Sequence, residues 1–344
     1  MQWEEGSIRF IRAWLINGSI MTAAVLCSLL MVEGTLRAIH YTYTPLRIQV
    51  INQSSEWRDY FKFWDEQAGV GNQEFVYDPF LIWRPRKGGL FANDQGYRGE
   101  KLPAVKQAGS VRIFAIGDSN TAGWPGWPGM DPPNWPMYLE QLLRKDSSRF
   151  TVTNAGVWGY SSFQGLRRFK EALPLKPDIV LISFGANDAM RHPLSDADFS
   201  NQKIRKANVD KILVKARLGQ LLLAVVDKLT LTGKDRLVAR VDLEEYRANL
   251  AEMVRLSNER GIKPVLLTRP FIEASSDRWW IRNFLPAYNA TTIEVARRTG
   301  VRAIDIYEHF KDEARYFSDE SHFTEEGYRR MARIVYEGIV DLLQ

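Results

Sequence analysis

From Val111 onward the sequence alternates short apolar runs with longer helix-like stretches, and this alternation constrains the fold more than any other feature. The runs are rich in Val, Ile and Leu, which predicts strands that are buried on both faces. We expect five strands, at Val111–Ile116, Phe150–Thr153, Ile179–Phe184, Pro264–Leu267 and Val301–Ile304. We expect helices at Trp135–Leu143, Phe163–Ala172, Leu243–Arg260, Phe284–Arg298 and Thr324–Leu343. Strands that alternate with helices form a parallel sheet covered on both sides.

Four polar blocks occupy loops that this α/β fold is expected to have. They read Gly117-Asp118-Ser119, Asn154-Ala155-Gly156-Val157-Trp158-Gly159, Gly185-Ala186-Asn187-Asp188 and Asp319-Glu320-Ser321-His322. The first three follow a predicted strand directly, and the fourth precedes the last predicted helix. Because ligands bind beyond the carboxyl ends of parallel strands, we expect the blocks to meet at that edge of the sheet. Each block alone is typical of an ordinary turn, so the prediction depends on the whole set.

Ser119 is the candidate nucleophile, since a serine at a strand-to-helix turn can present its hydroxyl at the sheet edge. Such a serine needs a general base, and the chain has four histidines, namely His40, His192, His309 and His322. Only His322 stands in an Asp-x-x-His segment, with Asp319 one turn before it. Asp319 would then hold the tautomer of the imidazole while His322 takes the serine proton.

An acyl-transfer site also needs donors for the negative oxygen that develops in the transition state. Gly159 offers a backbone N–H that can be approached closely, and Asn187 offers its side-chain amide. We assign supporting roles to Asp118, Asn154 and Asp188, which would tie the active-site loops together. The four blocks therefore supply a nucleophile, a base with its acid, and two oxyanion donors.

The order and content of these blocks resemble those of the SGNH hydrolases, also called the GDSL esterase and lipase superfamily. Carried over position by position, the resemblance places the nucleophile at Ser119, the oxyanion donors at Gly159 and Asn187, and the acid and base at Asp319 and His322. It implies a flavodoxin-like, three-layer α/β/α domain with about five parallel strands. It also implies ester hydrolysis without a metal or an organic cofactor.

The resemblance extends from about Arg112 to the C-terminus. Two positions depart from the family pattern: Asn120 replaces the leucine after the serine, and Phe323 replaces the proline that commonly follows the histidine. Both changes concern the shape of loops more than the chemistry. The N-terminal anchor and the segment that ends at Asn93–Glu100 look like those of membrane-anchored bacterial members.

The mostly apolar run Ala13–Val32 carries no charge and, at about 20 residues, is long enough to cross a bilayer. Arg9 and Arg12 precede it, so we expect a cytoplasmic N-terminus and a periplasmic C-terminal domain at a bacterial inner membrane. No small-x-small cleavage site follows, so we interpret the run as an uncleaved single-span anchor rather than a signal peptide. The sole cysteine, Cys27, lacks the preceding small residue of a lipoprotein signal.

We expect an anchor in residues 1–40, an aromatic, turn-rich extension packed on the main domain in residues 41–108, and the hydrolase domain in residues 109–344. Residues 193–240 do not fit the strand–helix alternation and form a predicted helical insertion. Basic residues precede an apolar run there: Lys203, Arg205, Lys206, Lys211, Lys215 and Arg217, then Leu221–Val226. Two interpretations stay open, a basic amphipathic helix that lies on a membrane or forms a lid, and a helical hairpin packed on the domain.

These features predict a membrane-anchored serine esterase that forms an acyl-serine. Its expected partners are an ester or acylated-glycan substrate and the membrane; the mild net charge of +5 gives no reason to expect nucleic acid. Tryptophans cluster near the four blocks: Trp124, Trp127, Trp135, Trp158, Trp279 and Trp280. They either line a cleft, where they stack on sugar rings or hold an acyl chain, or form a rigid cap over the sheet edge. The suggested substrate is an O-acetyl or short acyl ester on an envelope or exported polysaccharide.

Two alternatives stay open. An O-acyltransferase would use the same site and pass the acyl group to a glycan instead of to water. A catalytically inactive scaffold protein of the envelope would need none of the chemistry, and the five filled positions argue against it. The sequence makes no prediction of the oligomeric state.

Overall fold

The computed structural model describes residues 2–42, 75–78, 81–89, 91–123, 133–192, 195–198, 216–231, 238–272 and 279–343. The chain divides into two compact units, one of residues 1–71 with 206–233 and one of residues 72–205 with 234–344. The predicted boundaries at residues 40 and 108 stay predictions, because residues 43–74 lie outside the described residues. Trp124, Trp127 and the basic residues from Lys203 to Lys215 also lie outside the described residues.

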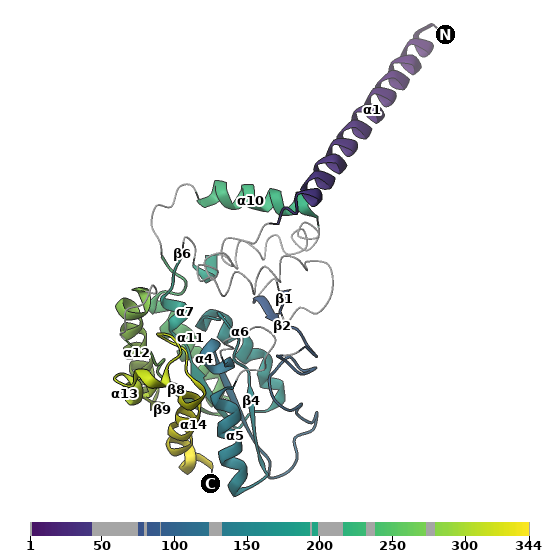
Figure 1. The fold of residues 1–344 in the computed structure, drawn as a ribbon. Coiled ribbons are helices and arrows are strands. Elements are labelled where there is room, and N and C mark those ends of the chain that lie inside the picture. The colour runs from purple at the N-terminus through teal and green to yellow at the C-terminus, as the bar shows by residue number, and fades with distance from the viewer. Residues whose placement is uncertain are drawn as a thin grey trace. The chain divides into compact units, whose positions relative to one another are not determined.

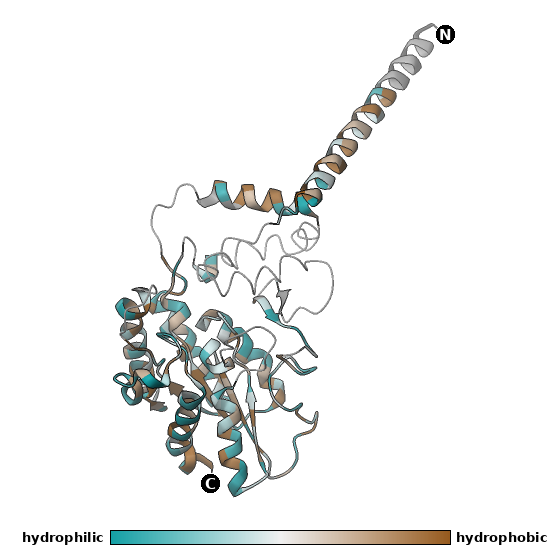
Figure 2. Ribbon diagram, viewed as in Figure 1, coloured by the Kyte–Doolittle hydropathy of each residue, from teal (hydrophilic) through white to brown (hydrophobic). Residues whose placement is uncertain are grey.

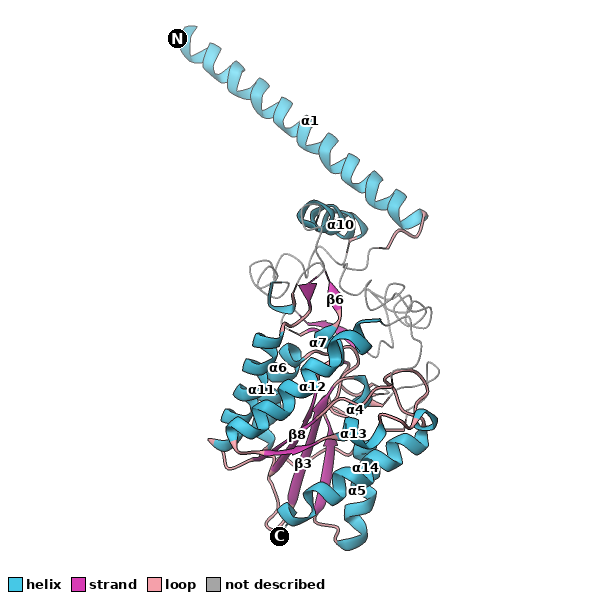
Figure 3. Ribbon diagram, turned by 90° about the vertical axis from the view of Figure 1, so that its left-hand side faces the viewer, coloured by secondary structure: helices cyan, strands magenta, loops and turns pink. Residues whose placement is uncertain are grey.

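A five-stranded parallel sheet forms the centre of the larger unit (Figure 3). Its strands are β3 (Val111–Gly117), β4 (Phe150–Asn154), β5 (Ile179–Ser183), β8 (Lys263–Leu267) and β9 (Arg302–Ile304). They lie in the order β4-β3-β5-β8-β9, and every neighbouring pair is parallel. This is the flavodoxin-like order, which confirms the predicted fold class. Each strand matches its predicted bounds to within one residue at either end.

Helices cover both faces of this sheet (Figure 3). One side carries α5 (Trp135–Asp146), α13 (Ile306–Phe310) and α14 (Glu325–Ile339), and the other carries α6 (Ser162–Ala172), α11 (Leu243–Asn258) and α12 (Trp279–Thr299). The core on the first side joins alternate strand residues to apolar helix residues, among them Ile113, Val152, Leu181, Leu139 and Tyr328. The three layers therefore bury both faces of the sheet, as the apolar strands require.

Polar caps fix where several of these helices begin. The side chains of Asn134, Asp242 and Thr324 accept backbone N–H groups of the first turns of α5, α11 and α14, at 3.0, 2.8 and 3.2 Å. Each cap satisfies a donor that has no partner within the helix. α12 begins at Trp279 rather than at the predicted Phe284, contains Pro286, and packs along α11.

Several short elements were not predicted, because a single turn or a two-residue strand carries no periodic signal. They are the helices α4 (Ser119–Ala122) and α7 (Ala186–Ala189), the strands β6 (Arg191–His192) and β7 (Val238–Ala239), and 3₁₀ turns at Leu173–Leu175, Ala314–Tyr316 and Val340–Leu343. The last of these turns follows α14, which therefore ends at Ile339, four residues before the predicted Leu343. α4 and α7 matter most here, since they follow β3 and β5 at the predicted edge.

Residues 75–102 belong to the larger unit and, where they are described, pack on its second block and on β4. β1 (Phe75–Asp78) and β2 (Ile82–Pro85) form an antiparallel hairpin. The indole N–H of Trp83 donates to the carbonyl of Trp158 at 3.0 Å, and the hydroxyl of Tyr160 donates to the carbonyl of Trp83 at 2.5 Å. Farther on, the backbones of Arg98 and Asn154 exchange two hydrogen bonds, at 2.9 and 3.3 Å, as an isolated antiparallel bridge. This part of the chain is thus joined to the second block and to the end of β4.

The smaller unit contains two described helices, α1 (Gln2–Ala38) and α10 (Arg217–Leu231) (Figure 1). Within α1, residues Trp14–Ala38 are long and apolar enough to cross a membrane (Figure 2). Their most apolar 18 residues have a mean hydropathy of 2.0, and none of these 18 is buried. By length and composition this helix fits both a membrane anchor and a signal sequence. α10 begins against the end of the apolar run, where the carboxylate of Glu33 accepts the backbone N–H groups of Arg217 and Leu218 at 3.1 and 2.7 Å.

Candidate active site

β3 leads directly into Ser119, the candidate nucleophile. Ser119 begins α4, and the carboxylate of Asp118 caps this turn by accepting the N–H of Asn120 at 2.9 Å. A Cβ atom on Gly117 would lie 2.2 Å from Thr121 Oγ1 and 2.7 Å from the carbonyl oxygen of Ser183. Only glycine therefore lets β3 pass this close to α4 and β5 just before the serine.

Ser119 meets His322 across 203 residues of sequence. Ser119 Oγ lies 2.7 Å from His322 Nε2, and His322 Nδ1 lies 2.6 Å from Asp319 Oδ2. Ser119 and His322 are 6% and 4% exposed, so the hydrogen bond between them is largely shielded from bulk water. The structure brings together the three residues that the sequence suggested as nucleophile, base and acid.

One carboxylate both shapes the histidine loop and orients the imidazole. Asp319 Oδ1 accepts the backbone N–H groups of Ser321 and His322, both at 2.8 Å, while Oδ2 faces the ring. The N–H of Ser318 closes the loop on the carbonyl of His322 at 2.8 Å. The Asp-x-x-His spacing thus works as a single turn, as expected.

Phe323, one of the two departures from the family pattern, anchors this loop in the core. It is 2% exposed, and its ring centroid lies 4.5 Å from that of Phe310 and 4.9 Å from that of Phe317. Phe317 and Phe323 also form a backbone bridge across the base of the loop. An aromatic residue here positions the loop through packing.

Arg269 joins the serine turn to the histidine loop and is absent from the residues predicted from the sequence. Its Nε donates to both carboxylate oxygens of Asp118, at 3.1 and 2.9 Å, and its Nη1 donates to the carbonyl of Ser321 at 2.8 Å. The side chains of Arg269 and Asp118 are each 1% exposed. Asn120, the other departure, donates to the same Ser321 carbonyl at 3.0 Å. The signal available in the sequence was a charged residue two positions after the end of a buried strand, at the edge where the blocks lie.

The second block is tied to the serine helix through Asn154. Asn154 Nδ2 donates to the carbonyl of Thr121 at 2.8 Å, and its Oδ1 accepts the N–H of Gly156 at 2.9 Å. A Cβ atom on Gly156 would lie 2.5 Å from the backbone nitrogen of Ala122, so this glycine permits the close approach of the block to α4. The contacts fit the supporting role expected of Asn154.

Gly159 and Asn187 are held on neighbouring loops. Asn187 Nδ2 donates one hydrogen to the carbonyl of Tyr160 at 3.0 Å, which orients its amide beside the second block. Gly159 has a backbone φ of +75°, a conformation that favours glycine. Its carbonyl accepts a hydrogen bond from Arg240 Nη1 at 2.9 Å.

Arg240 belongs to a buried polar cluster that was not predicted. Its guanidinium pairs with the carboxylate of Asp196 at 3.1 Å, and the two side chains are 1% and 0% exposed. Ser161 Oγ donates to the same carboxylate at 2.6 Å, and Arg240 Nη2 donates to Gln164 Oε1 at 3.1 Å. The two residues lie near the ends of the predicted 193–240 insertion, so this ion pair fixes both ends beside Gly159.

Asp188, the last residue of the third block, is fully buried. Its carboxylate accepts the N–H groups of Ser162 at 2.8 Å and Gly185 at 3.1 Å. Burial raises the pKa of Asp188 from an ordinary 3.8 to about 7, although the hydrogen bonds from Ser162 and the charge of Arg240 act in the opposite direction. Asp188 therefore ties the turn after β5 to the start of α6, which fits its expected supporting role.

Two of the tryptophans near the blocks are packing residues. Trp135 is 0% exposed and belongs to the core beside α14, and Trp158 is 3% exposed. The indole N–H of Trp158 donates to the carbonyl of Gly123 at 2.5 Å, and its ring meets that of Phe91 edge-on at 4.9 Å. Neither indole is therefore exposed for stacking on a sugar ring, and the choice between the two interpretations stays open for the other tryptophans.

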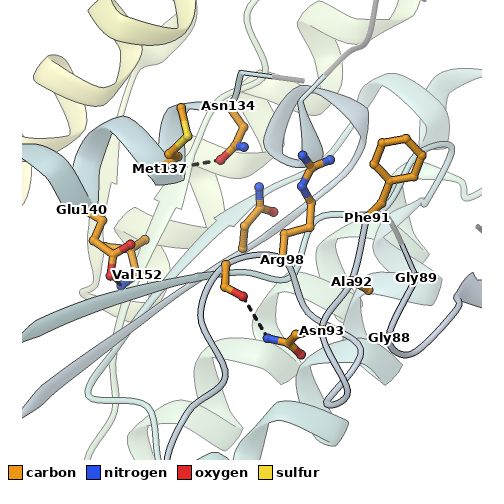
Figure 4. Close-up of a pocket in the computed structure, with 12 residues that line it drawn as sticks. Gly88, Gly89, Phe91, Ala92, Asn93, Arg98, Asn134, Met137, Glu140 and Val152 are labelled. Carbon is orange, nitrogen blue, oxygen red and sulfur yellow. Dashed lines mark hydrogen bonds between the residues drawn. The ribbon is translucent and has the colours of Figure 1, made fainter. Parts of the chain in front are cut away.

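A cavity of about 410 Å³ lies beside Asn154 of the second block (Figure 4). Arg98 and Phe91 of the N-terminal extension line it from one side, and Asn134 and Glu140 of the α5 region line it from the other. Asn154 is part of its lining, whereas Ser119, Asp319 and His322 are not. The cavity is therefore separate from the serine–histidine pair. Among the described residues, no group of three or more His, Cys, Asp or Glu side chains is placed to hold a metal ion.

A parallel α/β sheet with serine, histidine and aspartate hydrogen-bonded in series at its carboxyl edge is the arrangement of a serine-dependent acyl hydrolase. Residues 115–330 match the GDSL-like Lipase/Acylhydrolase family, and the chain belongs to this family. The protein is an ester-hydrolysing enzyme.

The similar proteins include an uncharacterised lipoprotein, YqeF, of Bacillus subtilis, which is 27% identical over 260 residues that cover 67% of this chain and 88% of the relative. An arylesterase of Vibrio mimicus is 36% identical over 91 residues, covering 26% of this chain and 44% of the relative. Among solved structures, a lipase/acylhydrolase from Enterococcus faecalis has a TM-score of 0.48 at 21% identity, covering 68% of this chain and 97% of its own. An acetylxylan esterase from Geobacillus stearothermophilus has a TM-score of 0.47 at 20% identity, covering 68% and 96%.

Proposed function

We propose that this ester hydrolase is a serine esterase in which Ser119 is the nucleophile, His322 the general base and acid, and Asp319 the partner of the imidazole. The observation that carries the proposal is the hydrogen-bonded series from Ser119 Oγ to His322 at 2.7 Å and from His322 to Asp319 at 2.6 Å. Both distances lie within the reach that proton transfer requires.

The proposed reaction has two halves. In the first, His322 Nε2 removes the proton of Ser119 as Oγ forms a bond to the ester carbonyl carbon, and the imidazolium then protonates the departing alcohol. In the second, His322 takes a proton from a water molecule as the water oxygen attacks the carbonyl carbon of the acyl-serine. The proton returns to Ser119 Oγ when the carboxylic acid leaves. Asp319 keeps the other ring nitrogen protonated throughout.

Gly159 and Asn187 are the proposed oxyanion donors. Asn187 Nδ2 carries two hydrogens, of which one bonds to Tyr160. We assign the other, together with the N–H of Gly159, to the oxygen that becomes negative in the tetrahedral intermediate. Each such donor typically lowers the barrier by ~3–4 kcal/mol. Arg240 supports this role by holding the carbonyl on the far side of Gly159.

The proposed substrate is a short acyl ester, in the first place an O-acetyl group on an envelope or exported polysaccharide. The proposed location is a bacterial inner membrane, with α1 as a single-span anchor and the catalytic domain outside the cytoplasm. The apolar helix near the N-terminus and the similarity to a lipoprotein support the location. The similarity to an arylesterase makes an aryl acetate the first substrate to test.

The test is hydrolysis of p-nitrophenyl acetate by the full chain in mild detergent. Ser119→Ala and His322→Ala should each lower kcat by at least about 10⁴-fold, because the proposed nucleophile and base act as one unit. Ser110→Ala is the matched control, since Ser110 directly precedes the other end of β3, and it should retain the wild-type rate. A fluorophosphonate should label the wild type and Ser110→Ala at Ser119 but leave Ser119→Ala unlabelled.

Equal rates for the wild type and Ser119→Ala would contradict the proposed mechanism. A rate that rises with added oligosaccharide, with acetylated sugar as the product, would assign the acyltransferase alternative instead. If the melting curves of the variants match that of the wild type, a loss of activity comes from the site and not from unfolding.

A further inference from the structure

α10 presents an apolar face to its surroundings while a polar residue is buried. Leu222, Val225 and Leu229 are 50%, 45% and 71% exposed, although they lie on one side of the helix at spacings of three and four residues. Gln220 projects from the opposite side and is only 4% exposed. This is the reverse of a helix on a water-facing surface, so the outer face of α10 is suited to an apolar medium.

The start of α10 is fixed at the end of the apolar run in α1. Glu33 is the first charged residue after that run, and its two carboxylate oxygens accept the N–H groups of Arg217 and Leu218. A carboxylate at a helix N-terminus satisfies donors that lack a partner within the helix and favours its dipole. Arg37, one turn later in α1, also pairs with Glu33, at 2.7 Å, so the joint between α1 and α10 is centred on Glu33.

We propose that α10 is an in-plane helix on the lipid surface at which α1 leaves the membrane, with Leu222, Val225 and Leu229 in the boundary between headgroups and acyl chains. The occupant of this face is the bilayer, because Glu33 places the first turn of α10 at the end of the proposed span. The sequence before the helix contains Lys211 and Lys215, and the helix begins with Arg217, which suits anionic headgroups. The inference rests on the proposed membrane anchor.

The experiment uses the full chain in vesicles of phosphatidylethanolamine and phosphatidylglycerol. Single cysteines at Leu222, Val225 and Leu229, in a Cys27→Ser background, carry a nitroxide whose collisions with oxygen and with a water-soluble nickel chelate are measured. Lys228→Cys tests another face of the same helix, and Val105→Cys is the matched control, since Val105 is an 81% exposed valine in the other unit. Cys27, in the unmodified chain, reports on α1 itself.

The expected result is a ratio of oxygen to nickel collisions that is several-fold higher at Leu222, Val225 and Leu229 than at Lys228 and Val105. Ratios at the three apolar positions equal to that at Val105 would overturn the inference, since the face would then meet water. Protection from both reagents would overturn it as well, because the face would then be covered by protein. With Glu33→Ala the ratios at Leu222 and Val225 should fall, and unchanged ratios would refute the role of the joint.

The failure of the anchor and the failure of this inference are distinguishable. If the nitroxide on Cys27 is in lipid while the labels on α10 are in water, the anchor stands and the in-plane helix is refuted. If Cys27 itself is in water, the proposed anchor is wrong and α10 has no membrane at its start.

Discussion

Replacing Arg269 by methionine should destabilise the larger unit strongly, because the change leaves a buried carboxylate without its partner. Arg269 donates to both oxygens of Asp118, and both side chains are 1% exposed. Breaking a buried ion pair by removing one partner typically costs about 3–5 kcal/mol. For a unit of this size, that cost corresponds to a fall in Tm of about 6–20 °C. The carbonyl of Ser321 loses one donor but keeps Asn120.

The assay is thermal unfolding of the full chain in detergent, followed by the tryptophan fluorescence of the larger unit. Arg298→Met is the matched control, because Arg298 pairs with Glu294 at 2.7 Å but is 62% exposed, and its loss should cost less than about 1 kcal/mol. A second variant, Asp118→Asn with Arg269→Met, removes the unpaired charge and keeps an acceptor for the N–H of Asn120. It should be more stable than Arg269→Met alone. A fall in Tm for Arg269→Met no larger than that of the control would refute the reasoning.

Three further predictions concern the site. Asp319→Asn should lower kcat for an aryl acetate by about 10⁴-fold, because His322 loses the acceptor that holds its tautomer, and a rate within tenfold of the wild type would contradict this. Arg240→Met should lower kcat by up to about 10²-fold with little change in KM, since the carbonyl of Gly159 loses its donor, whereas Arg302→Met, at an exposed pair, should leave both constants unchanged. Because burial raises the pKa of Asp188 to about 7, its contribution to stability is present below pH 3.8 and is lost as the pH rises to about 7, by up to about 4 kcal/mol. Denaturant titrations of Asp188→Asn should therefore show a flatter fall in stability between pH 4 and 7, and identical slopes would argue against a perturbed Asp188.

The residues brought together around Ser119 could be predicted because their signals are local. Ser119 and Asn187 each follow a buried strand, and parallel strands bring such positions to one edge. Asp319 and His322 are one turn apart, so their pairing needed no knowledge of the rest of the chain. The strand bounds were accurate for the same reason, since each buried run ends where the apolar residues end.

The charged residues that hold this site together could not be predicted in the same way. Arg269 pairs with Asp118 across 151 residues, and Arg240 pairs with Asp196 across 44 residues. Neither pair repeats with a helical or strand period, so only the folded chain shows which charges share a buried site. The same holds for the aromatic Trp158, because its position within the second block did not indicate that the indole is buried.

The backbone bridge between Arg98 and Asn154 has a consequence for the integrity of the sheet. β4 is an outer strand, and unpaired N–H and carbonyl groups on an outer strand can recruit another chain. The bridge occupies these groups at the carboxyl end of β4, and Trp83 covers the adjoining second block. The N-terminal extension therefore leaves fewer open backbone groups at this end of β4 for pairing with another chain. A chain that begins at residue 109 would retain every proposed catalytic residue but would leave the backbone groups at this end of β4 open to pairing with another chain.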